Sequence, residues 1–174
     1  MDDLHRAVNT RHMTFKLADR AWALSEKFTQ LLDAKALPGL MELKDALDDS
    51  LLQTAALETW KLFDHDKHAG SIHNVRRLLK SNAPQVPVPP LDLNAPEVRT
   101  ALDEVKKLRH EVMGHSNFRT DHAQDLGIPR LLEVARPFVE AVTESLGLSF
   151  YDKGTTQAVN ELEQLITWAS RGRT

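Results

Sequence analysis

Apolar residues recur every three or four positions along most of this chain, which is the spacing that places them on one face of an α-helix. Near the N-terminus, Leu17, Ala21, Leu24, Phe28 and Leu31 follow this spacing. No segment shows the strict alternation of a half-buried strand. The pattern predicts helices over about residues 14–37, 40–63, 72–79, 95–112, 128–146 and 156–169.

Residues that cap or stop helices mark several of the expected ends. We expect Ser71 and Asn94 to be N-caps, because a short polar side chain can accept a hydrogen bond from the first free N–H groups of a helix. Thr155 or Thr156 is the expected cap of the last helix, and Gly147 the expected stop of the one before it. These signals agree with the helices that the apolar spacing predicts.

Five of the eight prolines lie in one connecting segment at about residues 83–96: Pro84, Pro87, Pro89, Pro90 and Pro96. Proline removes a backbone donor and fixes φ, so this segment is expected to be a stiff loop without regular structure. We interpret it as a loop inside a single domain that spans residues 1–174. The expected fold is an all-α antiparallel bundle of four long helices with one or two short ones.

Composition excludes several classes of function. The 22 Lys and Arg residues face 25 Asp and Glu, and the net charge of -3 gives no overall attraction to nucleic acid or an anionic membrane. Any nucleic-acid site must therefore be a local patch. The chain has no cysteine, which excludes disulfides, thiolate metal sites and cysteine nucleophiles. Without a long apolar stretch or an apolar leader, we expect a cytoplasmic protein with no membrane partner.

The densest group of chemically versatile residues lies at the end of the fourth predicted helix, from Leu108 to Asn117. At about 100° per residue, Arg109 lies on one shoulder of the apolar face and His115 on the other. Six positions apart, the two side chains do not stack on one helix, where neighbours are three or four apart. Either Gly114 unwinds the last turn, or the two groups meet across two chains.

Arg109 and His115 together suit phosphodiester chemistry. A guanidinium is a permanently charged fork that fits a phosphate, and an imidazole exchanges protons near neutral pH. On RNA the attacking group can be the substrate's own 2′-hydroxyl, so this pair can suffice without a metal or other cofactor. Glu111, one turn before His115, can orient the imidazole. The alternative interpretation is a solvated set of polar residues at a helix end, which is common in proteins.

The order Arg109, then the polar His110, then four residues and His115 resembles the signature of the HEPN superfamily, the "higher eukaryotes and prokaryotes nucleotide-binding" domains. The segment from Trp60 to Asp64, followed by the short helix after Ser71, is similar to a segment of the abortive-infection branches of that superfamily. The resemblance covers about residues 57–117, and the flanking helices match only as generic bundle helices.

The resemblance implies a HEPN bundle that dimerises and acts as a metal-independent endoribonuclease of prokaryotic defence or toxin type. In that interpretation Arg109 holds the scissile phosphate of the RNA, His115 transfers a proton and His110 assists. An antitoxin or a nucleotidyltransferase is an expected protein partner. The expected substrate-binding residues are Glu111, Ser116, Asn117, Arg76 and Arg77.

Two other functions remain open at this point. One is a non-catalytic HEPN dimer that binds a nucleotide or a protein partner such as a nucleotidyltransferase, as the acidic balance suggests. The other is a metal-dependent helical hydrolase that uses His65, Asp66 and His68, although a polar loop of this kind is more often simply solvated. We interpret the three tryptophans, including Trp60, as core or dimer-interface residues.

Overall fold

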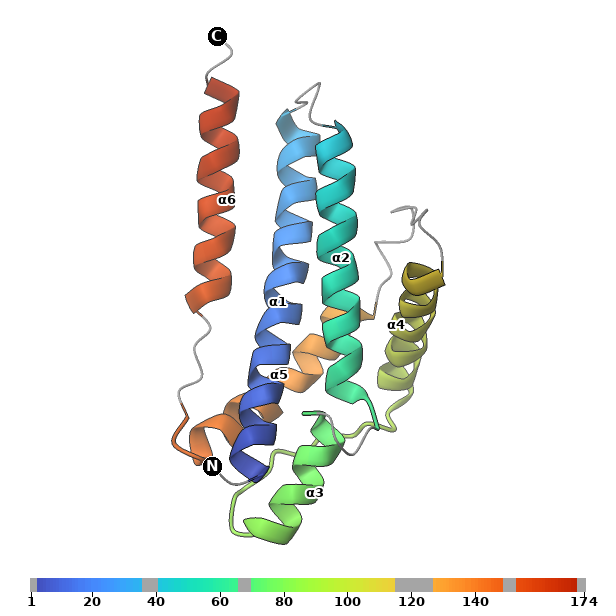
Figure 1. The fold of residues 1–174 in the computed structure, drawn as a ribbon, viewed down its shortest axis with the longest axis vertical. Coiled ribbons are helices and arrows are strands. Elements are labelled where there is room, and N and C mark those ends of the chain that lie inside the picture. The colour runs from blue at the N-terminus through green and yellow to red at the C-terminus, as the bar shows by residue number, and fades with distance from the viewer. Residues whose placement is uncertain (1–2, 36–40, 66–69, 115–126, 149–152, 172–174) are drawn as a thin grey trace.

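The computed structural model describes residues 3–35, 41–65, 70–114, 127–148 and 153–171, and within these ranges it contains six α-helices and no strand (Figure 1). The all-α prediction is confirmed. Five helices have 18 to 33 residues, one more long helix than expected, and the third has 11. The helices are α1 (Asp3–Lys35), α2 (Met41–Phe63), α3 (Ile72–Asn82), α4 (Pro96–Gly114), α5 (Ile128–Ser145) and α6 (Lys153–Arg171).

Helix α1 begins at Asp3, about eleven residues before the predicted start at residue 14. The reason is that two of the positions facing the core in this segment are polar: Arg11 and His12 are both buried. They interrupt the apolar spacing that Leu4, Val8 and Phe15 otherwise maintain. The hydrophobic pattern therefore does not predict the first turns of the helix, although the face that these turns direct to the core is buried.

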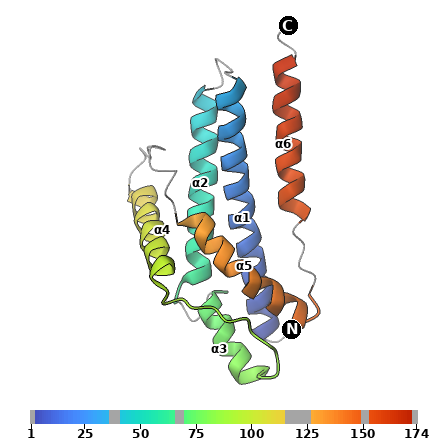
Figure 2. The same ribbon diagram turned by 180° about the vertical axis from the view of Figure 1, so that it is seen from behind.

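Helices α1 and α2 run antiparallel, as predicted, and a buried carboxylate joins them (Figures 1 and 2). Asp48 of α2 accepts hydrogen bonds from the hydroxyls of Ser25 and Thr29 of α1, the second over 3.0 Å. A buried carboxylate is costly unless its oxygens are satisfied. Since these two hydroxyls meet Asp48 in one register only, the contact fixes how far α2 lies along α1.

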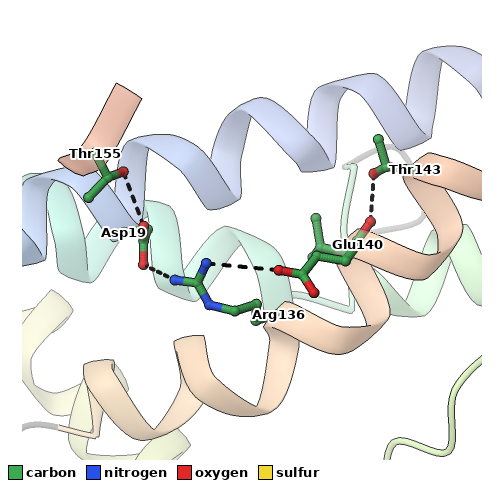
Figure 3. A network of polar contacts seen from close by, with 6 residues as sticks. Asp19, Arg136, Glu140, Thr143 and Thr155 are labelled. Carbon is green, nitrogen blue, oxygen red and sulfur yellow. Dashed lines mark hydrogen bonds and ion pairs between the residues drawn. The ribbon is translucent and has the colours of Figure 1, made fainter. Parts of the chain in front are cut away.

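A second polar contact joins α1 to α5 and α6 (Figure 3). Arg136 Nη2 lies 2.6 Å from Asp19 Oδ1, and Thr155 Oγ1 donates to Asp19 Oδ2 over 3.1 Å. Further along, Lys27 Nζ and Glu163 Oε2 are 3.3 Å apart, so α6 follows α1 in the same direction. The predicted cap role of Thr155 is wrong, because α6 already begins at Lys153 and the Thr155 hydroxyl serves Asp19.

Other local predictions can be checked at the ends of α3, α4 and α5. Ser71 is the N-cap of α3, and its hydroxyl accepts from the Asn74 N–H over 3.3 Å, as predicted. Gly147 stops α5 with a left-handed φ of 68°, and the Leu148 N–H donates to the Thr143 carbonyl as in a Schellman motif. Asn94 is not the N-cap of α4, because the helix begins at Pro96 and the Ala95 carbonyl accepts from the Arg99 N–H; the Asn94 side chain accepts from Arg99 Nη2. That cap prediction is therefore wrong.

The proline-rich connector is free of helix and strand from residue 83 to 95, as predicted. It nevertheless contributes Ala83 and Leu91 to the core, and Arg76 Nη1 of α3 donates to the Leu91 carbonyl over 3.3 Å. Gly127 then brings the start of α5 against α4, since a Cβ there would lie 2.4 Å from the Ala101 backbone. The connector and this close contact together position α4, which carries Arg109.

Among the described residues, one continuous cluster of buried apolar side chains runs through α1, α2, α3, α4 and α5. Each fully buried Leu, Ile or Phe in it stabilises the fold by about 1.5–3 kcal/mol relative to exposure. None of the described helices combines the length and apolar character needed to cross a lipid bilayer.

Arg11 is a charged residue inside this core. Its side chain is fully buried, and Nε, Nη1 and Nη2 find no hydrogen-bond acceptor among the described residues. Its Cζ lies 4.9 Å from the centre of the Phe138 ring. Burial lowers the pKa of Arg11 to about 9, which is still above neutral pH, so the guanidinium keeps its charge inside the protein. The aromatic contact offsets only part of the lost hydration.

We therefore expect Arg11→Met to raise the free energy of unfolding by about 1–4 kcal/mol, because methionine fills a similar length without a charge to desolvate. Urea denaturation measures the difference. Arg20→Met is the matched control on the exposed side of α1 and should change the free energy by less than about 0.5 kcal/mol. A less stable Arg11→Met protein would contradict the prediction.

Candidate functional site

Arg109 lies in the last two turns of α4, next to the face that this helix buries. Val98, Ala101, Val105 and Leu108 are buried in the core, and Arg109 follows Leu108 at the edge of that face with a partly exposed side chain. The predicted position on the shoulder of the apolar face is confirmed. A charge in this place is anchored by the helix and still reachable from solvent.

The guanidinium of Arg109 contacts the indole ring of Trp60 on α2. Its Cζ is 5.3 Å from the ring centre, within the range of a cation–π interaction. Arg109 forms no ion pair or hydrogen bond with any described residue. Contact through the ring face uses none of the five N–H donors, so these donors stay free to bind an oxyanion.

Trp60 belongs to this site, whereas its sequence context predicts only a core or dimer-interface residue. Its ring is partly buried, and its Nε1–H is buried without an acceptor among the described residues. The neighbouring Thr59 hydroxyl is buried in the same way. The signal that could have singled out Trp60 is its place at the start of the segment that resembles the abortive-infection branches, but no spacing rule links it to Arg109.

The other predicted residues of the motif are described only in part. His110 is exposed on α4, directly after Arg109. Glu111 belongs to α4, but its side chain lies outside the described residues, as do His115, Ser116 and Asn117. Both explanations for how Arg109 and His115 meet, an unwound last turn or a second chain, therefore remain predictions.

Arg76 and Arg77 do not lie beside Arg109. Figures 1 and 2 place α3 at the end of the molecule where α4 begins, whereas Arg109 lies towards the opposite end of α4. Both arginines have internal partners: Arg76 braces the Leu91 carbonyl, and Arg77 Nη2 donates to Asn74 Oδ1 over 2.8 Å. The structure therefore separates the basic edge of α3 from the Arg109 site.

The candidate metal ligands are only partly described. His65 is exposed, and its ring lies 3.9 Å from that of His73, centre to centre. Asp66 and His68 lie outside the described residues, and in the described part of the chain no three His, Cys, Asp or Glu side chains are grouped to hold a metal ion. The two imidazole rings are tilted by 34° against each other, and two histidines alone are fewer ligands than a zinc site uses.

Electrostatics favour the neutral imidazole at His73. Burial lowers its pKa most, nearby His65 and Arg76 lower it further, and Asp64 acts in the opposite direction. Burial also lowers the pKa of His12, with added repulsion from Lys16 and Arg11. Both histidines therefore take up a proton less readily in the folded protein than in the unfolded chain.

Comparison with known proteins gives no relative for this chain: no family model, no curated protein and no solved structure matches it. Any inference about the function of this chain therefore depends on its sequence and on the geometry of the site.

The lowered pKa of His73 predicts a loss of stability in mild acid. In the unfolded chain His73 takes up a proton near pH 6.5, whereas in the folded protein it does so only at a lower pH. The contribution of neutral His73 is thus fully present above pH ~6.5 and is lost as pH falls towards the lower folded pKa. We expect His73→Gln to flatten the plot of unfolding free energy against pH between 7 and 5, as measured by urea denaturation. Parallel curves for the two proteins would contradict this.

The contact between Arg109 and Trp60 predicts an energetic coupling between them. In a double-mutant cycle with Arg109→Met and Trp60→Leu, we expect the two changes to be non-additive by about 0.5–2 kcal/mol in the free energy of unfolding. Lys107 is exposed on the same helix, so Lys107→Met with Trp60→Leu is the control cycle and should give a coupling near zero. Equal couplings in the two cycles would show that Trp60 does not hold Arg109.

Proposed function

We propose that this chain is a helical bundle of the HEPN type that cleaves RNA without a metal, as an endoribonuclease of prokaryotic defence or toxin type. The observation that supports this function best is Arg109: a partly exposed guanidinium, held against the Trp60 ring, with no ion pair to a described residue. An arginine in this state can bind a phosphate without first releasing a carboxylate. Its place on α4 also agrees with the resemblance that the sequence motif carries.

In the proposed reaction the 2′-oxygen of the substrate attacks the adjacent phosphorus, and the bond from phosphorus to the 5′-oxygen breaks. Arg109 binds the phosphate oxygens and stabilises the negative charge that grows on them. His115 transfers a proton at the reacting oxygens, and His110 assists. The products are a 2′,3′-cyclic phosphate and a free 5′-hydroxyl, so protons and electrons balance without a cofactor.

A homodimer is part of this proposal, because it is one of the two ways in which the histidine and the arginine can meet. In a twofold arrangement, two copies of α4 would place both motifs in one shared cleft. Effective catalysis requires reacting groups to be held about 3–3.5 Å apart. A rigid helix that carries Arg109 is suited to this, since its side chain is already oriented by Trp60.

A second candidate function is a non-catalytic HEPN dimer that binds a nucleotide or a protein partner such as a nucleotidyltransferase. The observation that favours a protein partner is on α6, where Leu165 is 64% and Trp168 77% exposed. Large exposed apolar side chains, tryptophan above all, are typical of protein contacts. This candidate differs from the first in predicting no cleavage by the purified protein.

We expect the purified protein to cut single-stranded RNA in the presence of EDTA. Arg109→Ala and His115→Ala should each lower the cleavage rate at least ~100-fold, because each removes a charge-stabilising or proton-transferring group. Gel analysis of a labelled oligonucleotide measures the rate, and circular dichroism confirms that the variants fold.

Lys80→Ala, which removes one exposed cation from α3, is the control and should cut at the normal rate. A substrate with a 2′-deoxy sugar at the cleavage site should resist cleavage. Cleavage that survives both site substitutions would disprove the site, and absence of cleavage by the unmodified protein would favour the binding module.

A further inference from the structure

Most of the basic and most of the acidic residues of α4 lie on different sides of the helix, with the exposed Asp103 as the exception. At about 100° per residue, Arg99, Lys106 and His110 fall within ~40° of one another, and all three are exposed. Glu97 and Glu104 lie roughly 140–160° away from Arg99 around the axis. One side of the helix therefore presents a line of basic residues that ends next to Arg109.

The cations in the middle and second half of α4 are not held by acidic residues in the described part of the chain. Lys106, Lys107 and Arg109 form no ion pair with a described residue. On other helices several cations do have acidic partners. These are Lys27 with Glu163, Lys61 with Glu58, Arg130 with Glu133, and Arg136 with Asp19. Arg99 donates to Asn94, which is uncharged, so its positive charge also remains.

One acidic residue interrupts the line. Asp103 is exposed and lies about 40° from Arg99, between it and Lys106 along the helix. It forms no ion pair with a described residue, although cations stand three and four positions away from it. Its negative charge lowers the attraction of this face for anions. Removing this charge should therefore raise the affinity for an anion, just as removing a basic residue of the line should lower it.

We propose that Arg99, Lys106 and His110, which we name the α4 basic track, bind the phosphate backbone of single-stranded RNA and lead it to Arg109. The inference rests on the proposed function and names its substrate-binding surface. From Arg99 to His110 the track covers twelve residues, or ~16 Å along the helix axis. This length meets several consecutive phosphates on one side of the scissile bond.

Single-stranded RNA fits this surface better than a duplex. A duplex is recognised across its shallow minor groove by broad surfaces, whereas a single line of cations follows one backbone. The proposed 2′-oxygen attack also requires the attacking and leaving oxygens to align through phosphorus, and the stacked A-form helix prevents this alignment. The basic edge of α3 is not part of this line, because Arg76 and Arg77 lie on another helix, where they donate to the Leu91 carbonyl and to Asn74 Oδ1.

The test measures binding of a fully 2′-deoxy-substituted oligonucleotide, which resists cleavage, at several salt concentrations by fluorescence anisotropy. We expect Lys106→Gln to weaken binding roughly three- to ten-fold and to reduce the slope of log K against log salt by ~0.7, the value for one lost phosphate contact on a single strand. Asp103→Asn should tighten binding by a similar factor, because it removes the opposing charge. Lys80→Gln, the control for an equal charge lost from α3, should leave affinity and slope unchanged.

The outcomes separate this inference from the proposed function. Oligonucleotide binding that depends on Lys106 and Asp103, without cleavage of the matching RNA, supports the track and disproves the nuclease. The track is overturned if RNA cleavage depends on Arg109 while the Lys106 and Asp103 variants bind the oligonucleotide as well as the unmodified protein does. Equal weakening by Lys80→Gln and Lys106→Gln also overturns it, since the effect would then be one of overall charge. A duplex bound more tightly than the single strand overturns the choice of substrate.

Discussion

The packing of α1 against four other helices is the constraint on which the rest of this structure depends. Along its 33 residues α1 contacts α2, α3, α5 and α6. Its apolar face supplies most of the burial, but apolar contacts alone tolerate sliding of one helix along another. The two carboxylates, Asp19 of α1 and Asp48 of α2, remove that freedom, because each is satisfied in one arrangement only. The position of α2, and so of Trp60, follows from this register.

In the described part of the chain three arginines lie over aromatic rings, and their surroundings give them different roles. Arg11 lies over Phe138 in the core, Arg136 over Phe15 while it also binds Asp19, and Arg109 over Trp60. Burial removes Arg11 from any ligand, and the carboxylate already occupies Arg136. Only Arg109 combines partial exposure with the absence of a described acidic partner. The same contact type therefore serves the fold in two places and leaves a free cation in the third.

Local sequence signals predicted the helices well where the core-facing positions are apolar. Ser71 and Gly147 act as predicted because a cap and a left-handed turn depend only on neighbouring backbone. The start of α1 and the role of Thr155 were wrong for a different reason. In both places a polar side chain is bound or buried by a distant helix, and such a partner is invisible in a local pattern. The separation of Arg76 from Arg109 was likewise invisible in the sequence, because it depends on where α3 packs.

The amino-acid sequence by itself determined that the chain is helical, where its proline-rich connector lies, and that Arg109 stands at the edge of a buried helix face. These properties follow from the periodicity of side chains along a single helix and from the backbone chemistry of proline, glycine and serine. Only the tertiary structure decided that Trp60 faces Arg109, that Lys106 and Lys107 of α4 have no ion pair with a described residue, and that Arg11 is enclosed. Contacts between distant segments depend on the register and packing of whole helices, which no spacing within one segment encodes.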